Sequence, residues 1–81
     1  MTVSIEFFGI QRSITATDRI TLSVSDDTKV HNVLAYVRQR YPGLPLEEGS
    51  ILVTVNQHVA SLDRHLKQND AVAFVPCIGG G

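Results

Sequence analysis

Residues 70–81 read Asp70-Ala71-Val72-Ala73-Phe74-Val75-Pro76-Cys77-Ile78-Gly79-Gly80-Gly81. The apolar run over residues 71–76 is too short for a helix and is typical of a central strand that is buried on both faces. The glycines that follow have no Cβ, so this segment can be threaded into a narrow site. We therefore expect a folded domain over residues 1–76 and a flexible tail over residues 77–81. The alternative is that three glycines are simply a frayed chain end.

Composition narrows the class of protein. The 81 residues include seven Lys or Arg, eight Asp or Glu and a single Cys, with a formal net charge of −1. This length suits one small domain, and the balanced charge argues against nucleic acid or an anionic membrane as a partner. One cysteine cannot build a disulfide framework or a four-cysteine metal site. With no basic leader and no apolar stretch of 18 residues, we expect a soluble cytoplasmic protein.

Two periodicities divide the rest of the chain. Apolar and polar residues alternate over 2–7 and again over 19–24, which predicts two strands joined by a long loop, with no helix expected in residues 10–17. An apolar stripe at helical spacing then predicts one main helix, starting from an N-cap in 25–28 and stopped by Pro42-Gly43; its members are Val30, Val33, Leu34, Val37 and Tyr41. Alternation returns at 51–55, with a short return strand at 58–60.

The order of elements is strand, strand, helix, strand, short strand, strand. A hairpin, a crossover helix and a central last strand describe an α+β protein with the β-grasp, or ubiquitin-like, architecture. We expect a mixed sheet of about five strands with one main helix packed across it. The crossover through the helix should set the third or the last strand parallel to the first.

A resemblance to a known family rests on Val55-Asn56-Gln57, Ser61-Leu62-Asp63, Leu66, the strand from Asp70 to Pro76 and the closing Gly80-Gly81. Over nearly the whole chain this pattern resembles the MoaD and ThiS type of ubiquitin-like sulfur carrier, and it is closest to the small subunits of molybdopterin synthase. The Phe74-x-Pro76 signature favours the molybdopterin branch over the thiamine-pathway carriers, which share the fold and the diglycine.

The resemblance implies a function for the end of the chain. Gly81 would be adenylated by an ATP-using enzyme of the ubiquitin-activating type and then converted to a thiocarboxylate with sulfur from a sulfurtransferase. Gly80 would give the tail passage into the large subunit of molybdopterin synthase, where the sulfur goes to a pterin precursor in molybdenum cofactor biosynthesis. Such a carrier binds no cofactor itself and is not an enzyme by itself.

A partner surface is also expected. The alternation places an apolar strip on the sheet face away from the helix, and such a strip is unusual for a small monomer. Together with the first part of the tail, the expected partner-binding residues are Phe8, Leu52, Ala73, Val75, Pro76, Cys77, Ile78 and Gly79.

Other interpretations stay open at this point. The protein could be a ubiquitin-like modifier that forms isopeptide bonds through Gly81, or a β-grasp interaction module with an idle tail. Cys77 is either a small hydrophobe or a reactive thiol. His31, His58 and His65 lack the spacing of a metal site, and we expect them at the surface with no metal bound.

Overall fold

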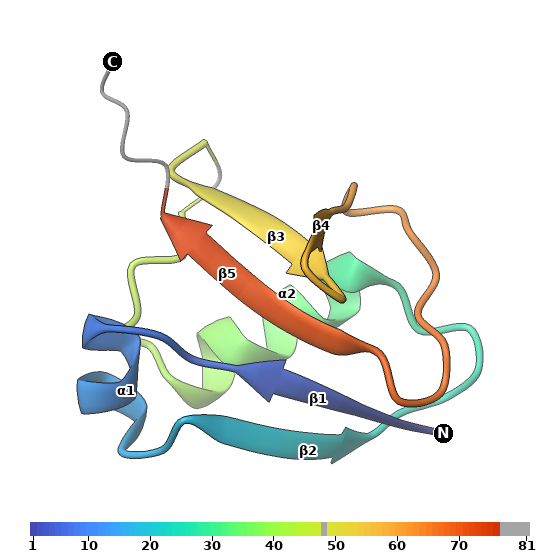
Figure 1. Ribbon diagram of the computed structural model, residues 1–81, viewed down its shortest axis with the longest axis horizontal. Coiled ribbons are helices and arrows are strands. Elements are labelled where there is room, and N and C mark those ends of the chain that lie inside the picture. Colours follow the sequence, from blue (N-terminus) through green and yellow to red (C-terminus); the bar gives the residue numbers. More distant parts are fainter. Residues whose placement is uncertain (48, 77–81) are drawn as a thin grey trace.

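The computed structural model describes residues 1–47 and 49–76, which form β1 (Thr2–Glu6), α1 (Ile10–Thr15), β2 (Arg19–Ser23), α2 (Val30–Arg40), β3 (Ile51–Val55), β4 (His58–Val59) and β5 (Ala71–Pro76). Over these residues the strands make one five-stranded sheet in the order β2-β1-β5-β3-β4, and α2 lies behind it in the view of Figure 1. Within residues 1–47 and 49–76, no helix covers the opposite face of the sheet, which we call the open face. This arrangement confirms the predicted β-grasp architecture.

The last strand occupies the centre of the sheet. β5 runs parallel to β1, with Ile5 opposite Val72, and antiparallel to β3, with Val53 opposite Phe74. The backbone of β5 is therefore hydrogen-bonded on both edges. The expectation of a central last strand is confirmed. Of the two strands that could run parallel to the first, the third and the last, it is the last that does so.

The hydrophobic core lies between α2 and the sheet. The four aliphatic members of the predicted stripe lie in α2 and are each no more than 3% exposed. The fifth member, Tyr41, follows the end of the helix and is partly buried. Phe7 and Phe74 are buried in the same cluster, and the Phe7 ring meets Tyr41 edge-on at a centroid distance of 5.6 Å. The buried apolar cluster consists of Val3, Ile5, Phe7, Val30, Val33, Leu34, Val37, Leu44, Leu46, Val53, Val55, Leu66, Val72 and Phe74.

The start of α2 differs from the prediction. The polar cluster at 25–28 does not supply the N-cap; it forms a turn in which the Ser25 hydroxyl donates to Asp27 at 2.6 Å. This hydrogen bond, helped by the backbone N–H of Asp27, holds the pKa of the Asp27 carboxyl below its ordinary value of 3.8. The N-cap residue is instead Lys29, one residue after the cluster, and the helix begins at Val30. The Asn32 side chain accepts a hydrogen bond from the Lys29 N–H at 2.9 Å. Of the four N-cap formers in this cluster, Ser25, Asp27 and Thr28 form hydrogen bonds with one another in the local turn.

The prediction of no helix in residues 10–17 was wrong. α1 spans Ile10–Thr15, and its inward side is made of Gln11 and Thr15, both less than 9% exposed. Ile10 and Ile14 face solvent instead, with exposed fractions of 69% and 39%. Because polar residues occupy the buried side, the helix has no inward apolar stripe for periodicity to detect.

A polar bracket joins the β3–β4 turn to the start of β5. Asn56, at a φ of 52° in the turn, donates from Nδ2 to the Asp70 carboxylate at 2.9 Å and accepts from the Ala71 N–H at 3.0 Å. Asp70 is 5% exposed and also accepts from the Lys67 N–H at 2.8 Å. Asn is favoured here because it tolerates the left-handed conformation and supplies both a donor and an acceptor. This bracket links two of the segments that carry the family resemblance, Val55-Asn56-Gln57 and Asp70-Ala71.

We predict that Asn56→Asp destabilises the fold by about 1–3 kcal/mol, because the Asp70 carboxylate loses a donor and gains a neighbouring negative charge. Equilibrium urea unfolding at neutral pH measures the change. Asn69→Asp is the matched control, since Asn69 also has a left-handed φ, of 68°, but is exposed at the surface. Equal losses in the two variants would contradict a structural role for the bracket.

Candidate functional site

The end of β5 is the point from which the chain continues towards its carboxyl terminus. Pro76 closes the strand opposite Ile51, the first residue of β3, and both Pro76 and its neighbour Val75 are exposed. The predicted tail residues Cys77, Ile78, Gly79, Gly80 and Gly81 lie outside the described residues. The site therefore consists of the strand end and the surface around it.

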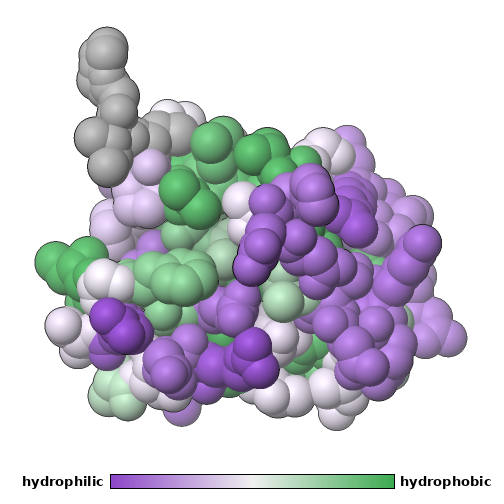
Figure 2. Space-filling view, viewed as in Figure 1, coloured by the Kyte–Doolittle hydropathy of each residue, from purple (hydrophilic) through white to green (hydrophobic). Residues whose placement is uncertain are grey.

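An apolar patch lies beside this strand end on the open face of the sheet. It consists of Phe8, Leu52 and Val75, whose exposed fractions are 56%, 44% and 40%. Leu52 and Val75 are directly opposite in the β3–β5 register, so their side chains lie on the same face. Figure 2 looks onto this face and shows apolar side chains gathered over the end of β5 and over β3, with polar ones below and to the right. Exposed apolar groups in one cluster are typical of a protein-binding surface.

The placement of Ala73 in the exposed strip needs correction. Ala73 lies two residues before Val75 and so points to the open face, but it is only 5% exposed. Its register partners on either side are Glu6 and Thr54, and both have larger side chains. The single methyl of an alanine between longer neighbours in the middle of a sheet is covered by them. Ala73 therefore lies beneath its neighbours on the open face and presents almost no surface to a partner.

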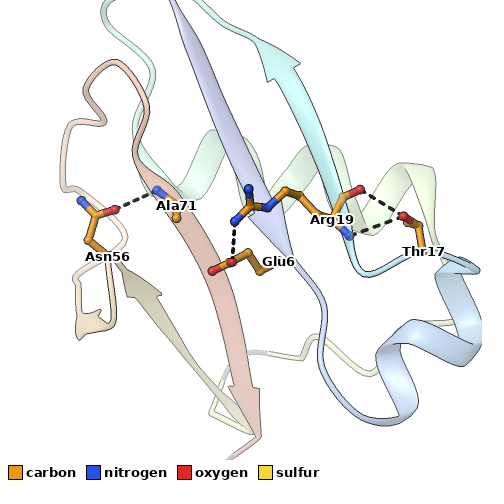
Figure 3. Close-up of polar contacts among 5 residues, drawn as sticks. All are labelled: Glu6, Thr17, Arg19, Asn56 and Ala71. Atoms are coloured by element: carbon orange, nitrogen blue, oxygen red, sulfur yellow. Dashed lines mark hydrogen bonds and ion pairs between the residues drawn. The ribbon is translucent and has the colours of Figure 1, made fainter.

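Polar side chains border the apolar patch. Arg19 on β2 donates to the Glu6 carboxylate on β1 at 2.9 Å, as Figure 3 shows beside the Asn56–Ala71 contact. The two side chains are 57% and 28% exposed, so this ion pair contributes little to stability. It adjoins a pocket of about 390 Å³ lined by Glu6, Phe7, Phe8, Arg12, Asp18 and Arg19. A charged rim around apolar anchors fits the anatomy of a protein interface.

Gln11 contacts both sides of this surface and was missed by sequence reasoning. Its side-chain Nε2 donates to the carbonyl oxygen of Phe74 on β5 at 2.9 Å, and its Oε1 accepts from the Phe8 N–H at 3.1 Å. The side chain is buried, at 3% exposure. A polar pair at i and i+4, Gln11 and Thr15, was the available signal, but exposed polar residues in loops give the same pattern.

The part of the chain that the structure describes contains neither a cluster of metal ligands nor a helix that could span a membrane. Among residues 1–47 and 49–76, no three His, Cys, Asp or Glu side chains gather as a group that could hold a metal ion. The three histidines that we expected at the surface are exposed. In the same part of the chain, no helix has the length and apolar character needed to cross a membrane.

Comparison with known proteins identifies the family. The family model described as the ThiS family matches residues 5–81. The chain belongs to the ThiS family. This ThiS family protein is 32% identical over 80 residues to the molybdopterin synthase sulfur carrier subunit of Mycobacterium tuberculosis, and the match covers 98% of this chain and 96% of that protein.

Solved structures agree with this assignment. The complex of subunits 1 and 2 of the molybdopterin-converting factor from Helicobacter pylori contains a chain that is 26% identical, with a TM-score of 0.65 and full coverage of both chains. Small archaeal modifier protein 1 from Methanosarcina acetivorans is also 26% identical, with a TM-score of 0.76 and coverage of 99% of this chain and 96% of that one. The resemblance seen in the sequence is thus confirmed. The relatives from Escherichia coli and Haemophilus influenzae are likewise named molybdopterin synthase sulfur carrier subunits.

The two faces of β5 should respond differently to substitution. We predict that Phe74→Ala lowers the free energy of unfolding by about 3–5 kcal/mol, because it opens a cavity in the core. Val75→Thr, at the next residue of the same strand, should change it by less than about 0.5 kcal/mol, because that side chain is partly exposed on the open face. Urea unfolding of both variants tests which face of β5 is buried. A larger loss of stability in Val75→Thr than in Phe74→Ala would contradict the assignment.

Proposed function

We propose that this protein carries sulfur as a thiocarboxylate at Gly81 and donates it as the small subunit of a molybdopterin synthase. The observation that supports this most strongly is the apolar patch at the end of β5, because the same strand leads in sequence to Gly80-Gly81. The match to curated sulfur carrier subunits over 98% of the chain supports the molybdopterin branch.

The chemistry at Gly81 requires activation by a separate enzyme. An ionised carboxylate is a poor electrophile, so a carboxylate oxygen of Gly81 first attacks the α-phosphorus of ATP and releases pyrophosphate. A hydrosulfide sulfur then attacks the acyl carbon and displaces AMP, which leaves the thiocarboxylate. ATP is bound by an adenylating enzyme of the ubiquitin-activating type. A sulfurtransferase persulfide releases the hydrosulfide when a thiol reductant attacks it and the two remaining sulfurs form a disulfide. We place these steps in the cytoplasm, where ATP is available.

The tail has the composition to deliver this group. Residues 77–81 span at most about 17 Å when fully extended, which is enough to pass from the carrier surface into a pocket of a partner. Gly79 and Gly80 have no Cβ atoms, so this part of the tail can pass through a narrow entrance. Cys77 and Ile78, together with Pro76, would contact the entrance of the pocket. Gly81 would then reach the acceptor.

The large subunit of molybdopterin synthase is the proposed partner of the apolar patch. The patch lies where the tail begins, so burying it would also aim the tail into the same partner. The likeness to a chain in the complex of subunits 1 and 2 from Helicobacter pylori supports a partner of this kind. The activating enzyme would meet the same strand end at a different time.

A protein modifier is the second candidate function, favoured by the likeness to small archaeal modifier protein 1. In that case the adenylated Gly81 would be attacked by a lysine amine of a target, and AMP would leave. Covalent conjugates that require Gly81 in the native host would then accompany, or replace, sulfur transfer.

The tail should tolerate change at Cys77 and not at Gly80. We predict that Gly80→Ala lowers the rate of sulfur transfer by about 100-fold, because a Cβ beside the reacting carbonyl displaces it in a narrow site. Cys77→Ser should stay close to the wild-type rate, and both variants should keep the wild-type melting temperature. Thiocarboxylate formation, followed by mass spectrometry, and sulfur transfer to the pterin precursor are assayed separately.

Two results would contradict this assignment. If Cys77→Ser is inactive while Gly80→Ala works, the reactive group is the thiol. If a carrier with a tag fused after Gly81 still transfers sulfur, the terminal carboxyl is not the site.

The apolar patch should contribute more to binding than to folding. We predict that Phe8→Lys weakens binding to the large subunit by about 30-fold or more, which corresponds to about 2 kcal/mol, and leaves stability within about 0.5 kcal/mol. Tyr36→Lys is the control, because Tyr36 is an aromatic residue with 40% exposure on α2, behind the sheet. Isothermal titration calorimetry gives the dissociation constants. Equal weakening by the two variants would argue against the open face as the interface.

A further inference from the structure

The parallel ladder between β1 and β5 lacks its last backbone hydrogen bond, near the end of β5. The Ser4 N–H donates to the Asp70 carbonyl oxygen at 2.9 Å, and Ser4 and Glu6 lie opposite Ala71 and Ala73. A parallel ladder repeats every two residues. If the ladder continued beyond the end of β1 at Glu6, the N–H of Phe8 would therefore meet the carbonyl oxygen of Phe74.

The side chain of Gln11 occupies that missing rung. The Phe8 N–H donates to Gln11 Oε1 at 3.1 Å, and Gln11 Nε2 donates to the Phe74 carbonyl oxygen at 2.9 Å. One planar amide thus stands between the two backbone groups and gives each a partner. A primary amide suits this place because it offers an acceptor and a donor on neighbouring atoms. The carbonyl oxygen of Phe74 would otherwise be buried without this hydrogen bond, which is costly.

The inserted amide lets β1 leave the sheet while the end of β5 stays in place. The backbone N–H of Gln11 also donates to the Phe8 carbonyl oxygen at 3.0 Å, so Gln11 holds Phe8 by both of its backbone groups. Gly9, with a φ of 56°, makes the turn into α1 at this point. Phe8 is displayed on the open face, and Phe74 immediately precedes Val75 and Pro76. Gln11 therefore connects the two ends of the apolar patch across 63 residues of sequence.

We infer that Gln11 is a positioning residue for sulfur transfer: it fixes the strand end from which residues 77–81 depart relative to Phe8, the anchor that docks on the partner. This inference rests on the proposed function. Gln11 does not touch the reacting atoms, and its effect passes through the backbone of β5. Transfer requires the acyl group to lie at a defined place in the acceptor site. If the end of β5 can move relative to the docked Phe8, the acyl group is misplaced there.

The test compares two buried polar residues of α1. Gln11→Met removes both hydrogen bonds at nearly constant length, whereas Thr15→Val removes the hydroxyl that donates to the Thr17 carbonyl oxygen at 2.8 Å, away from β5. Each carrier is prepared as the thiocarboxylate and saturated with the large molybdopterin synthase subunit of the same organism. Single-turnover formation of molybdopterin is then measured at a temperature where circular dichroism shows every variant folded. The dissociation constants are measured in parallel.

The expected result is a fall of about ten-fold or more in the saturated single-turnover rate of Gln11→Met, with Thr15→Val at the wild-type rate. Gln11→Glu keeps the acceptor for Phe8 and loses the donor to β5 when ionised, so it should also be slow, and it serves if the Met variant does not fold. Equal rates for wild type and the folded Gln11 variants would overturn the positioning role. A wild-type thiocarboxylate that transfers no sulfur would instead overturn the proposed function, so the two failures are told apart.

Discussion

The central position of β5 is the constraint on which the rest of this structure depends. β5 is the last strand in sequence, yet it pairs with β1 on one side and β3 on the other. A strand hydrogen-bonded on both edges cannot shift its register without breaking both ladders and exposing its buried side chains. The residues that follow Pro76 in sequence are therefore attached to one of the most firmly held strands of the fold.

The same strand serves the core and the partner surface with alternate residues. Val72 and Phe74 are fully buried against the helix side, while Val75 is exposed on the open face beside Leu52. Stability and recognition thus depend on different side chains of one short segment, which is why substitutions at neighbouring positions should have such different effects. A strand end that is hydrogen-bonded on both edges and lies beside an apolar patch would give any partner that docks there the same starting geometry.

Most of the fold could be predicted from local patterns because the core elements follow simple periods. The alternation in β1 and β3, the stripe of α2 and the apolar run of β5 each specify which side is buried. α1 could not be found in this way, because its buried positions are polar. Gln11 is paired with Phe74, 63 residues later, and no local pattern reports such a contact. The burial of Ala73 likewise depends on Glu6 and Thr54 from two other strands.

The family resemblance implies that the function lies at Gly81, and the most direct test of that proposal is the intact mass of the protein purified from its own host, followed by fragmentation to locate any change. The account predicts a fraction whose mass increase equals the replacement of one oxygen by sulfur, with the change at Gly81. A protein that carries its sulfur on Cys77, or that shows only an unmodified terminal carboxylate while the host is making molybdopterin, would contradict it.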